Sequence, residues 1–270
     1  MHTGRLIVIE GPDHSGRSMH VKLLTDRLEA HGVATATIGL ARSKLIGTLL
    51  KSRTSDIHQL GWRARSLLYA TDLHDQIKHQ ALPLLKAGFV VIADRYSLTP
   101  KIRESVRGGS EEWIDSLYKS IPTPDSIIIL HAGPRRLLNR IMFGESLESL
   151  NHFESGMDMG LSLSRTTSFL EYQKIIRNKF LEEGEKIGAT MVPTKYSAEE
   201  IHNKIWDSIQ PAVSDIIQPI DTSRCVHWDD LFEDSKKMPT TYFEGKHWFA
   251  PCEFGDTSII LNTHSHPWIN

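Results

Sequence analysis

Residues 11–18, Gly11-Pro-Asp-His-Ser-Gly-Arg-Ser18, combine the residue types that bind phosphate. Gly11 and Gly16 allow a tight turn that brings the backbone close to a ligand. In such a loop, the backbone N–H groups and the first turn of the following helix form an anion site. Ser18 is placed to direct its hydroxyl at Mg²⁺. The pattern therefore predicts a site for a phosphorylated ligand.

Arg17 stands where the standard loop, G-x-x-x-x-G-K-[ST], has lysine. Arginine is cationic and can grip phosphate with two nitrogens, but it is longer and planar and is not equivalent to a compact ammonium group. The substitution is compatible with phosphate binding and leaves efficient phosphoryl transfer open. A glycine-rich turn without a ligand is the weaker interpretation, because a strand and a helix flank the segment as the motif requires.

Two more groups of candidate ligands follow other apolar runs. Asp94 and Arg95 stand at the end of the run 89–94, where an acid can hold Mg²⁺ and an arginine can reach phosphate. Arg42 lies in the loop that follows the run 33–38. In an open α/β sheet, ligands bind beyond the carboxyl ends of the strands, so we expect these side chains near the loop. The alternatives are a structural Asp94–Arg95 ion pair and a solvated Arg42.

The order of the predicted elements places these loops at one edge of a sheet. Short apolar runs predict strands at 5–10, 33–38, 89–94, 126–130 and 189–193. Apolar residues at helical spacing predict helices at 19–31, 48–53, 61–87, 110–118, 134–143, 165–186 and 197–210, with a bend near Pro83. Because the strands alternate with helices, we predict an α/β fold with a parallel β-sheet flanked by helices.

The composition is typical of a globular protein, with 40% hydrophobic and 24% charged residues among 270. A formal net charge of −2 does not favour a broad surface for nucleic acid or membrane. Two cysteines, Cys225 and Cys252, do not suffice for a disulfide scaffold and fit a reducing compartment, so we expect a cytoplasmic protein. We expect no signal peptide and no membrane span, because no apolar run has the required length and setting.

Several motifs, in order along residues 4–212, resemble the thymidylate kinase family of P-loop nucleoside monophosphate kinases. The similar segments are Ile9-Glu10-Gly11-Pro12-Asp13 with Ser15-Gly16 (family loop E-G-x-D-x-x-G-K-[ST]), Ala41-Arg42-Ser43 with Ile46-Gly47 (E-R-S/T…I-G), Leu67-Leu68-Tyr69-Ala70 (L-L-F-[AS]), Ala93-Asp94-Arg95-Tyr96 (D-R-Y), and Arg107-Gly108 through Leu130 (R-G-x-x-x-x-W…P-x-P-D-x-x-I-x-L). The resemblance implies a fold like that of P-loop nucleoside triphosphate hydrolases. It also implies a dTMP kinase-like enzyme of nucleotide biosynthesis, which transfers the ATP γ-phosphate to a (deoxy)nucleoside monophosphate with Mg²⁺.

The resemblance also implies roles for individual residues and an assembly. ATP would be bound by Gly11, His14, Ser15, Gly16, Arg17 and Ser18, and Mg²⁺ by Ser18 and Asp94. The acceptor nucleotide would be bound by Asp13 at the sugar, by Arg42 and Arg95 at the phosphate, and by Tyr69 through stacking on the base. Arg17, Asp94 and Arg95 would carry catalysis. Family members are commonly homodimers, which is the assembly that the resemblance suggests.

Three positions depart from the family pattern. Besides Arg17, Leu73 stands where the family usually has an arginine that reads the thymine edge, and His131 stands where the family has an acid. We therefore expect altered base selection or reduced catalysis. The alternative hypothesis is a nucleotide-binding homologue with weak or no kinase activity that acts through its C-terminal extension.

The resemblance divides the chain into two predicted parts, a thymidylate kinase-like P-loop domain at 1–212 and an aromatic-rich C-terminal extension at 213–270. Residues 144–164 are polar and weakly patterned, as in a mobile lid or an ordinary surface loop. In the extension, residues 258–261 predict a strand. Zinc is a weaker hypothesis than buried or surface roles for its cysteines and histidines, Cys225, His227, His247, Cys252, His264 and His266.

Overall fold

The computed structural model describes residues 4–51, 59–144, 152–218, 248–251 and 258–261. The chain forms two compact units that divide between residues 218 and 219. The first holds five strands and the helices that cover them, and the second holds a two-stranded antiparallel hairpin, β6 (Trp248–Pro251) and β7 (Ser258–Leu261). The strand expected at 258–261 is thus confirmed. The domain boundary expected at 212/213 stays a prediction.

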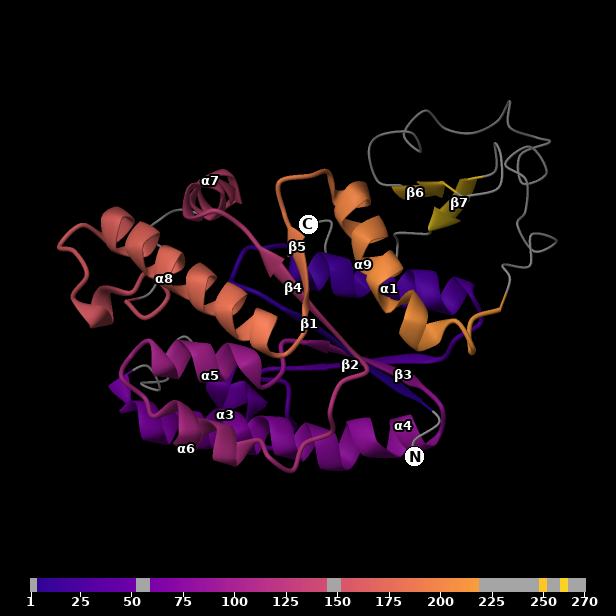
Figure 1. Ribbon diagram of the computed structural model, residues 1–270, viewed down its shortest axis with the longest axis horizontal. Coiled ribbons are helices and arrows are strands. Elements are labelled where there is room, and N and C mark those ends of the chain that lie inside the picture. The colour runs from indigo at the N-terminus through magenta and orange to yellow at the C-terminus, as the bar shows by residue number, and fades with distance from the viewer. Residues whose placement is uncertain (1–3, 52–58, 145–151, 219–247, 252–257, 262–270) are drawn as a thin grey trace. The chain divides into compact units, whose positions relative to one another are not determined.

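The central sheet is wholly parallel, in the order β2-β3-β1-β4-β5. Its strands are β1 (Arg5–Glu10), β2 (Thr35–Gly39), β3 (Val90–Asp94), β4 (Ser126–His131) and β5 (Thr190–Pro193). Helices lie on both faces, so the predicted α/β fold is confirmed (Figure 1). Because β1 lies between β3 and β4, the loop that follows β1 opens beside the ends of both neighbours.

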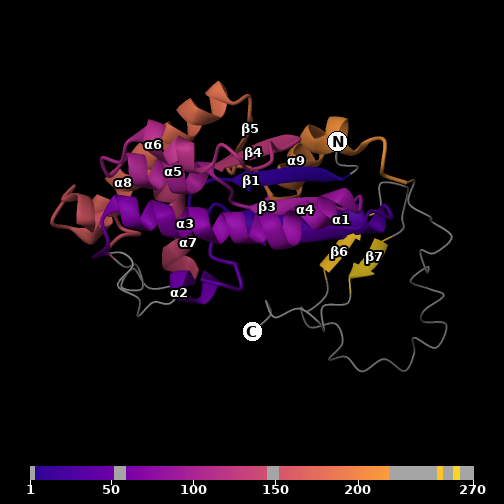
Figure 2. The same cartoon turned by 90° about the horizontal axis from the view of Figure 1, so that it is seen from below.

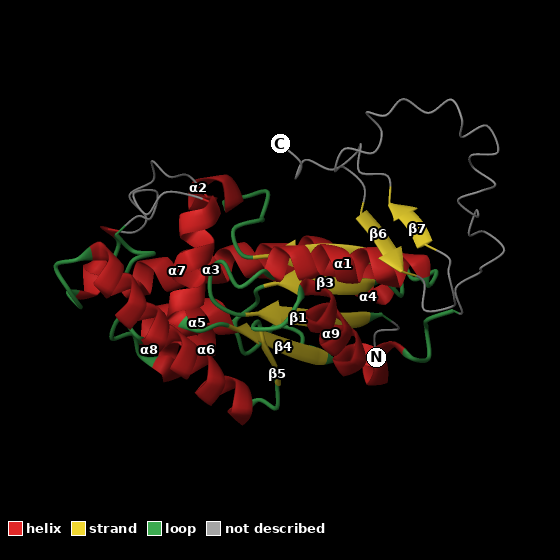
Figure 3. Ribbon diagram, turned by 90° about the horizontal axis from the view of Figure 1, so that it is seen from above, coloured by secondary structure: helices red, strands yellow, loops and turns green. Residues whose placement is uncertain are grey.

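The two faces of the sheet are covered by different helices. One face packs on α1 (Arg17–Ala30) and α9 (Ala198–Val213), as Figure 3 shows. The other packs on α3 (Trp62–Gln76), α4 (Leu82–Lys86) and α6 (Glu111–Leu117), seen in Figure 2. Alternate residues of β1 point to opposite faces, as expected for a strand buried on both sides.

The remaining helices of the first unit are α2 (Gly47–Lys51), α5 (Leu98–Ser105), α7 (Pro134–Gly144) and α8 (Arg165–Lys186). The sequence patterning did not predict α5. Ser197 caps α9 with a reciprocal Ser197–Glu200 capping box. The irregularity expected near Pro83 is a π-helical turn at Ile77–Ala81, in which the Leu82 N–H bonds the Ile77 carbonyl. A wide turn before Pro83 accommodates a ring that crowds the preceding helical turn.

Candidate active site

The loop between β1 and α1 has the backbone shape of an anion-binding nest. Gly11 has φ +139°, and a Cβ on it would lie 2.2 Å from the Leu130 carbonyl oxygen, so only glycine fits. His14 and Gly16 also have positive φ, at 60° and 93°. The loop ends where α1 begins, at Arg17, so its N–H groups and the positive end of the helix dipole come together.

Arg17 folds back under this loop. Its Nη1 donates to the Gly11 carbonyl oxygen at 2.5 Å and to the Pro12 carbonyl, and its Nε donates to Asp94 Oδ1 at 3.2 Å. The residue is only 7% exposed. Burial lowers the pKa of the guanidinium, and the neighbouring Asp94 carboxylate opposes that shift. Arg17 therefore places a buried positive charge beside the loop.

Asp94, at the end of β3, accepts hydrogen bonds from three side chains on two other segments, the start of α1 and the loop after β2. Its Oδ2 accepts hydrogen bonds from Ser18 Oγ at 2.7 Å and Arg42 Nη2 at 2.9 Å, while Oδ1 accepts from Arg17. The Asp94 side chain is 6% exposed. We call Arg17, Ser18, Arg42 and Asp94 the Asp94 cluster. The structure thus brings together four of the residues singled out in the sequence.

Two buried polar residues of α3 hold the Arg42 loop, and the sequence analysis missed both. Asp72 accepts from the backbone N–H groups of Ala41 (2.7 Å) and Ser43 (2.9 Å), which flank Arg42. Gln76 donates to the Gly39 carbonyl (2.7 Å) and accepts from the Gly39 N–H (3.1 Å). The available signal was a pair of polar residues four apart in a helix whose neighbouring positions, Tyr69, Ala70 and Leu73, are apolar.

A second cluster forms around Asp13. Its Oδ1 pairs with Arg95 Nη2 and its Oδ2 with Arg103 Nη2. We call Asp13, Arg95 and Arg103 the Asp13 cluster. Arg95 Nε is buried with no hydrogen-bond partner among the described residues. Burial and, as a smaller cause, repulsion from Arg103 lower the pKa of Arg95 well below its usual range. A contact of 3.8 Å between Arg17 Nη2 and Asp13 Oδ1 joins the two clusters.

Glu10 fixes the helix that carries Arg103. Its side chain is fully buried and accepts hydrogen bonds from the Tyr96, Leu98 and Thr99 N–H groups and the Thr99 hydroxyl. Burial raises the pKa of Glu10, although these bonds oppose the shift. The carboxyl group therefore ties the end of β1 to the start of α5.

The other predicted residues lie around the clusters in different settings. Tyr69 is 6% exposed and packs with Leu50 and the apolar part of the Arg42 loop. Leu73 is fully buried in the apolar layer between α3 and the sheet. The His14 carbonyl accepts from Arg140 Nη1 at 2.9 Å, and Ser15 Oγ accepts from Arg17 Nη1 at 3.4 Å.

His131 stands at the end of β4. Burial and, as a smaller cause, repulsion from Arg177 lower the pKa of its imidazole. An imidazole with a lowered pKa therefore stands at the end of the strand where the family pattern has an acid.

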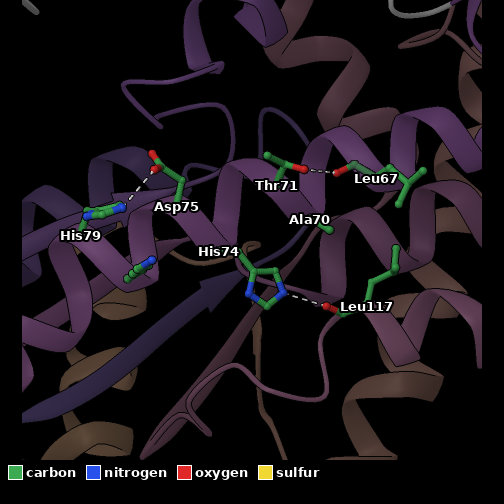
Figure 4. Close-up of a pocket in the computed structure, with 8 residues that line it drawn as sticks. Leu67, Ala70, Thr71, His74, Asp75, His79 and Leu117 are labelled. Atoms are coloured by element: carbon green, nitrogen blue, oxygen red, sulfur yellow. Dashed lines mark hydrogen bonds and ion pairs between the residues drawn. The ribbon is translucent and has the colours of Figure 1, made fainter.

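A hollow of about 450 Å³ lies elsewhere on α3. Its lining, Leu67, Ala70, Thr71, His74, Asp75, Lys78, His79 and Leu117, includes no member of either cluster (Figure 4). His74 Nε2 bonds to the Leu117 carbonyl oxygen at 2.8 Å and ties α3 to α6. The hollow is thus separate from the candidate active site.

Part of the stretch 144–164, predicted as a mobile lid or an ordinary surface loop, and most of the extension lie outside the described residues. Residues 152–160, which follow the undescribed stretch 145–151, are held by Arg107: it pairs with Asp158 through Nε (2.7 Å) and Nη2 (3.2 Å) and stacks on Phe153. The candidate zinc ligands, Cys225, His227, His247, Cys252, His264 and His266, are not among the described residues. Within the described part of the chain, no three His, Cys, Asp or Glu residues form a metal-binding group. No helix there is long and apolar enough to cross a membrane.

Comparisons with known proteins point to one family. The family model described as thymidylate kinase matches residues 9–205. A probable thymidylate kinase 2 of Saccharolobus solfataricus is 32% identical over 173 residues, which cover 64% of this chain and 79% of the relative. The thymidylate kinase of Schizosaccharomyces pombe is 27% identical over 207 residues, covering 76% and 91%. A solved thymidylate kinase from Candida albicans shares the fold, with a TM-score of 0.57 at 20% identity over 77% of this chain and 92% of the other.

Proposed function

The chain belongs to the thymidylate kinase family, and we propose that it is an ATP-dependent nucleoside monophosphate kinase whose first candidate acceptor is dTMP. The observation that carries the proposal is the convergence of a glycine-bounded anion loop, a hydroxyl and a carboxylate on one point. Phosphoryl transfer depends mainly on positioning and on electrostatic stabilisation of the transferred group. These side chains are of the types that such a reaction requires.

At the donor end, the loop backbone from Gly11 to Gly16 would cradle the ATP phosphates, with His14 and Ser15 contributing N–H groups. Arg17 would balance the charge of the terminal phosphates from beneath the loop. Its Nη1 is committed to loop carbonyl oxygens and its Nε to Asp94, so its charge is held in a fixed place. Arg17 therefore supplies a preorganised cation rather than a mobile one.

The oxygens near Arg17 suit Mg²⁺. Ser18 Oγ and Asp94 Oδ2 lie 2.7 Å apart, and hydroxyl and carboxylate oxygens are the hard ligands that Mg²⁺ prefers. Ser18 and Asp94 would hold the ion directly or through its waters. When bound, Mg²⁺ would supply positive charge that neutralises the negative charge developing during phosphoryl transfer.

At the acceptor end, Arg42 and Arg95 would orient the monophosphate. Asp13 would lie at the sugar, and Tyr69, beside the Arg42 loop, would stack on the base. Fully buried Leu73 offers no hydrogen-bond donor for a base edge, so other groups must select the base. Assembly as a homodimer and a cytoplasmic role in nucleotide biosynthesis are parts of the same proposal.

The test is an assay of diphosphate formation from ATP and Mg²⁺ with each nucleoside monophosphate in turn, beginning with dTMP. The baseline is a Ser18→Ala, Asp94→Ala double variant, which lacks both proposed metal ligands. We expect turnover by the native protein well above this baseline, with one preferred acceptor. Equal rates for the two proteins with every acceptor would refute the proposal.

A further inference from the structure

We propose that Arg103 is an acceptor-binding residue, which forms with Arg95 a paired guanidinium site for the dianionic phosphate of the acceptor. The inference rests on the proposed function and adds to it a residue that neither the motifs nor the sequence pattern singled out. Arg103 lies in the last turn of α5, and its guanidinium pairs with the same carboxylate, that of Asp13, as Arg95 does.

The geometry makes Asp13 a bridge between the two arginines. Each guanidinium gives one Nη2 to a different oxygen of Asp13. Within the described residues, the Asp13 carboxylate is the only hydrogen-bond acceptor of the Arg103 side chain. Arg95 Nε, in turn, is buried without a partner. The pair therefore keeps N–H donors beyond those that Asp13 uses, and arginine donors match phosphate oxygens in a forked geometry.

The charge of the site points to a doubly charged anion. The two clusters contain four guanidinium groups, from Arg17, Arg42, Arg95 and Arg103, and two carboxylates, from Asp13 and Asp94. Counted by themselves, the two clusters carry an excess of two positive charges; the carboxyl groups of Glu10 and Glu154, which also act on Arg95, lie outside this count. A phosphate monoester carries about −2 near neutral pH. Without Arg103, the excess would fall to one. A partly buried excess of like charge is costly unless a counter-ion arrives.

Anchors at both ends of α5 hold Arg103 in place. At the start, Glu10 binds the first N–H groups of the helix. Just beyond its end, Arg107 donates to the Arg103 carbonyl oxygen at 3.0 Å and pairs with Asp158 through two nitrogens. A guanidinium on a fixed helix loses little freedom when it binds a ligand, so it suits preorganised recognition.

The competing interpretation is that Arg103 only neutralises Asp13. Calorimetric titration distinguishes phosphate binding by Arg103 from simple neutralisation of Asp13. dTMP and thymidine are each titrated, without ATP, into three proteins: the native protein, Arg103→Gln and Arg103→Lys. The matched control is Arg63→Gln, which removes the same charge from an exposed arginine stacked on Trp62. The melting temperature of each variant checks folding.

We expect Arg103→Gln to weaken dTMP binding by about tenfold to a hundredfold, the range for loss of charge-assisted hydrogen bonds. Thymidine binding should change less than twofold, Arg103→Lys should be intermediate, and Arg63→Gln should match the native protein. Raising the salt concentration should weaken dTMP binding less in Arg103→Gln than in the native protein.

Three results would overturn the inference. The first is dTMP binding by Arg103→Gln that equals that of the native protein, and the second is an equal loss of affinity for dTMP and for thymidine in Arg103→Gln. The third is a native protein that binds dTMP no more tightly than thymidine. Because the titration needs no turnover, it is independent of the assay for the proposed function. A native protein that bound dTMP through Arg103 but formed no diphosphate would disprove the kinase and leave this inference standing.

Discussion

The two carboxylates of the site have different surroundings. The Asp94 side chain is 6% exposed and is held by a hydroxyl and two arginines, whereas the Asp13 side chain is 32% exposed and bridges Arg95 and Arg103. Asp94 ends a central strand that is buried along its whole length. Asp13 lies in the loop. The Asp94 carboxylate is thus fixed by the core, whereas the Asp13 carboxylate remains partly open to solvent.

This difference suits two tasks. A buried carboxylate with fixed partners keeps its geometry during a reaction, because protein interiors are close-packed and resist small displacements. A partly exposed bridge between two arginines leaves room for a ligand to enter and exchange with solvent. We therefore assign transfer chemistry to Arg17, Ser18 and Asp94, and acceptor binding to the Asp13 cluster together with Arg42. The predictions below, from the largest expected effect to the smallest, test that division.

Of the first three predictions, the one for Arg17 has the largest expected effect, and that effect falls on the chemical step. Arg17→Ala removes the cation beneath the loop, so we expect kcat to fall by about 10²-fold, as when one preorganised electrostatic group is lost. Arg17→Lys keeps the charge but loses the Nε bond to Asp94, so it should retain at least about a tenth of native kcat. Steady-state kinetics with saturating ATP and acceptor measure both values.

The Arg17 variants also distinguish the two functions that the sequence left open, an active kinase and a nucleotide-binding homologue with weak or no kinase activity. If Arg17→Lys turned over more than about tenfold faster than the native protein, the native loop would be impaired in transfer. A nucleotide-binding role with little catalysis would then be the better description.

The Asp72 contacts predict a smaller effect, confined to the acceptor. In Asp72→Asn, a single amide oxygen replaces the two carboxylate oxygens that hold the Ala41 and Ser43 N–H groups, so the Arg42 loop should loosen. We expect the acceptor KM to rise about tenfold, which corresponds to the free energy that one buried hydrogen bond to a charged group contributes. The KM for ATP should change less than twofold.

Asp75→Asn is the matched control for this prediction. Asp75 contacts the same loop through the Ser43 hydroxyl, at 2.6 Å, and not through the backbone. Its substitution should leave both KM values near native. If Asp72→Asn raised both KM values equally, the contact would support the whole fold and not the position of Arg42.

The third prediction concerns stability at the donor end. His20, on α1 close to Gly16, is 1% exposed; burial and then repulsion from Arg140 lower its pKa from 6.5 to about 4. Between these values the unfolded chain binds more protons than the folded one, so stability is full above pH 6.5 and falls as the pH drops toward 4. From pH 7 to pH 5, His20 should account for a loss of about 2 kcal/mol.

Urea unfolding at the two pH values measures this loss. His20→Leu should make the measured loss smaller by about 2 kcal/mol, whereas His79→Leu, at a side chain that is 64% exposed, should leave it unchanged. A second buried histidine, His202, also has its pKa lowered to about 4 by burial, so it adds to the loss measured in the native protein. Its ring lies parallel to that of His20, with the two ring centroids 6.3 Å apart. An acid dependence identical in the native protein and His20→Leu would contradict the prediction.

Most of the fold could be predicted because local signals agreed with the final structure. Apolar runs at the strands, Ser110 and Ser197 as helix caps, and alternating elements all indicated the same parallel sheet. Helix α5 escaped prediction because it has few apolar positions, and contacts distant in sequence fix it, above all Glu10.

The candidate site was only partly predictable, for a similar reason. Motif spacing found Ser18, Arg42 and Asp94, which the structure brings together. It could not find Asp72 and Gln76, whose importance depends on which backbone groups they meet, nor Arg103, which meets Asp13 from 90 residues away. Such partners become visible only when the chain is folded.

The most direct test of the division between transfer chemistry and acceptor binding is the kinetics of Asp94→Asn and Arg103→Gln measured side by side, with both KM values and kcat for each. We predict that Asp94→Asn lowers kcat by about 10²- to 10³-fold with little change in the acceptor KM. Arg103→Gln should instead raise the acceptor KM with kcat near native. If both variants changed the same parameter by similar factors, the clusters would act as one unit and the division would be wrong.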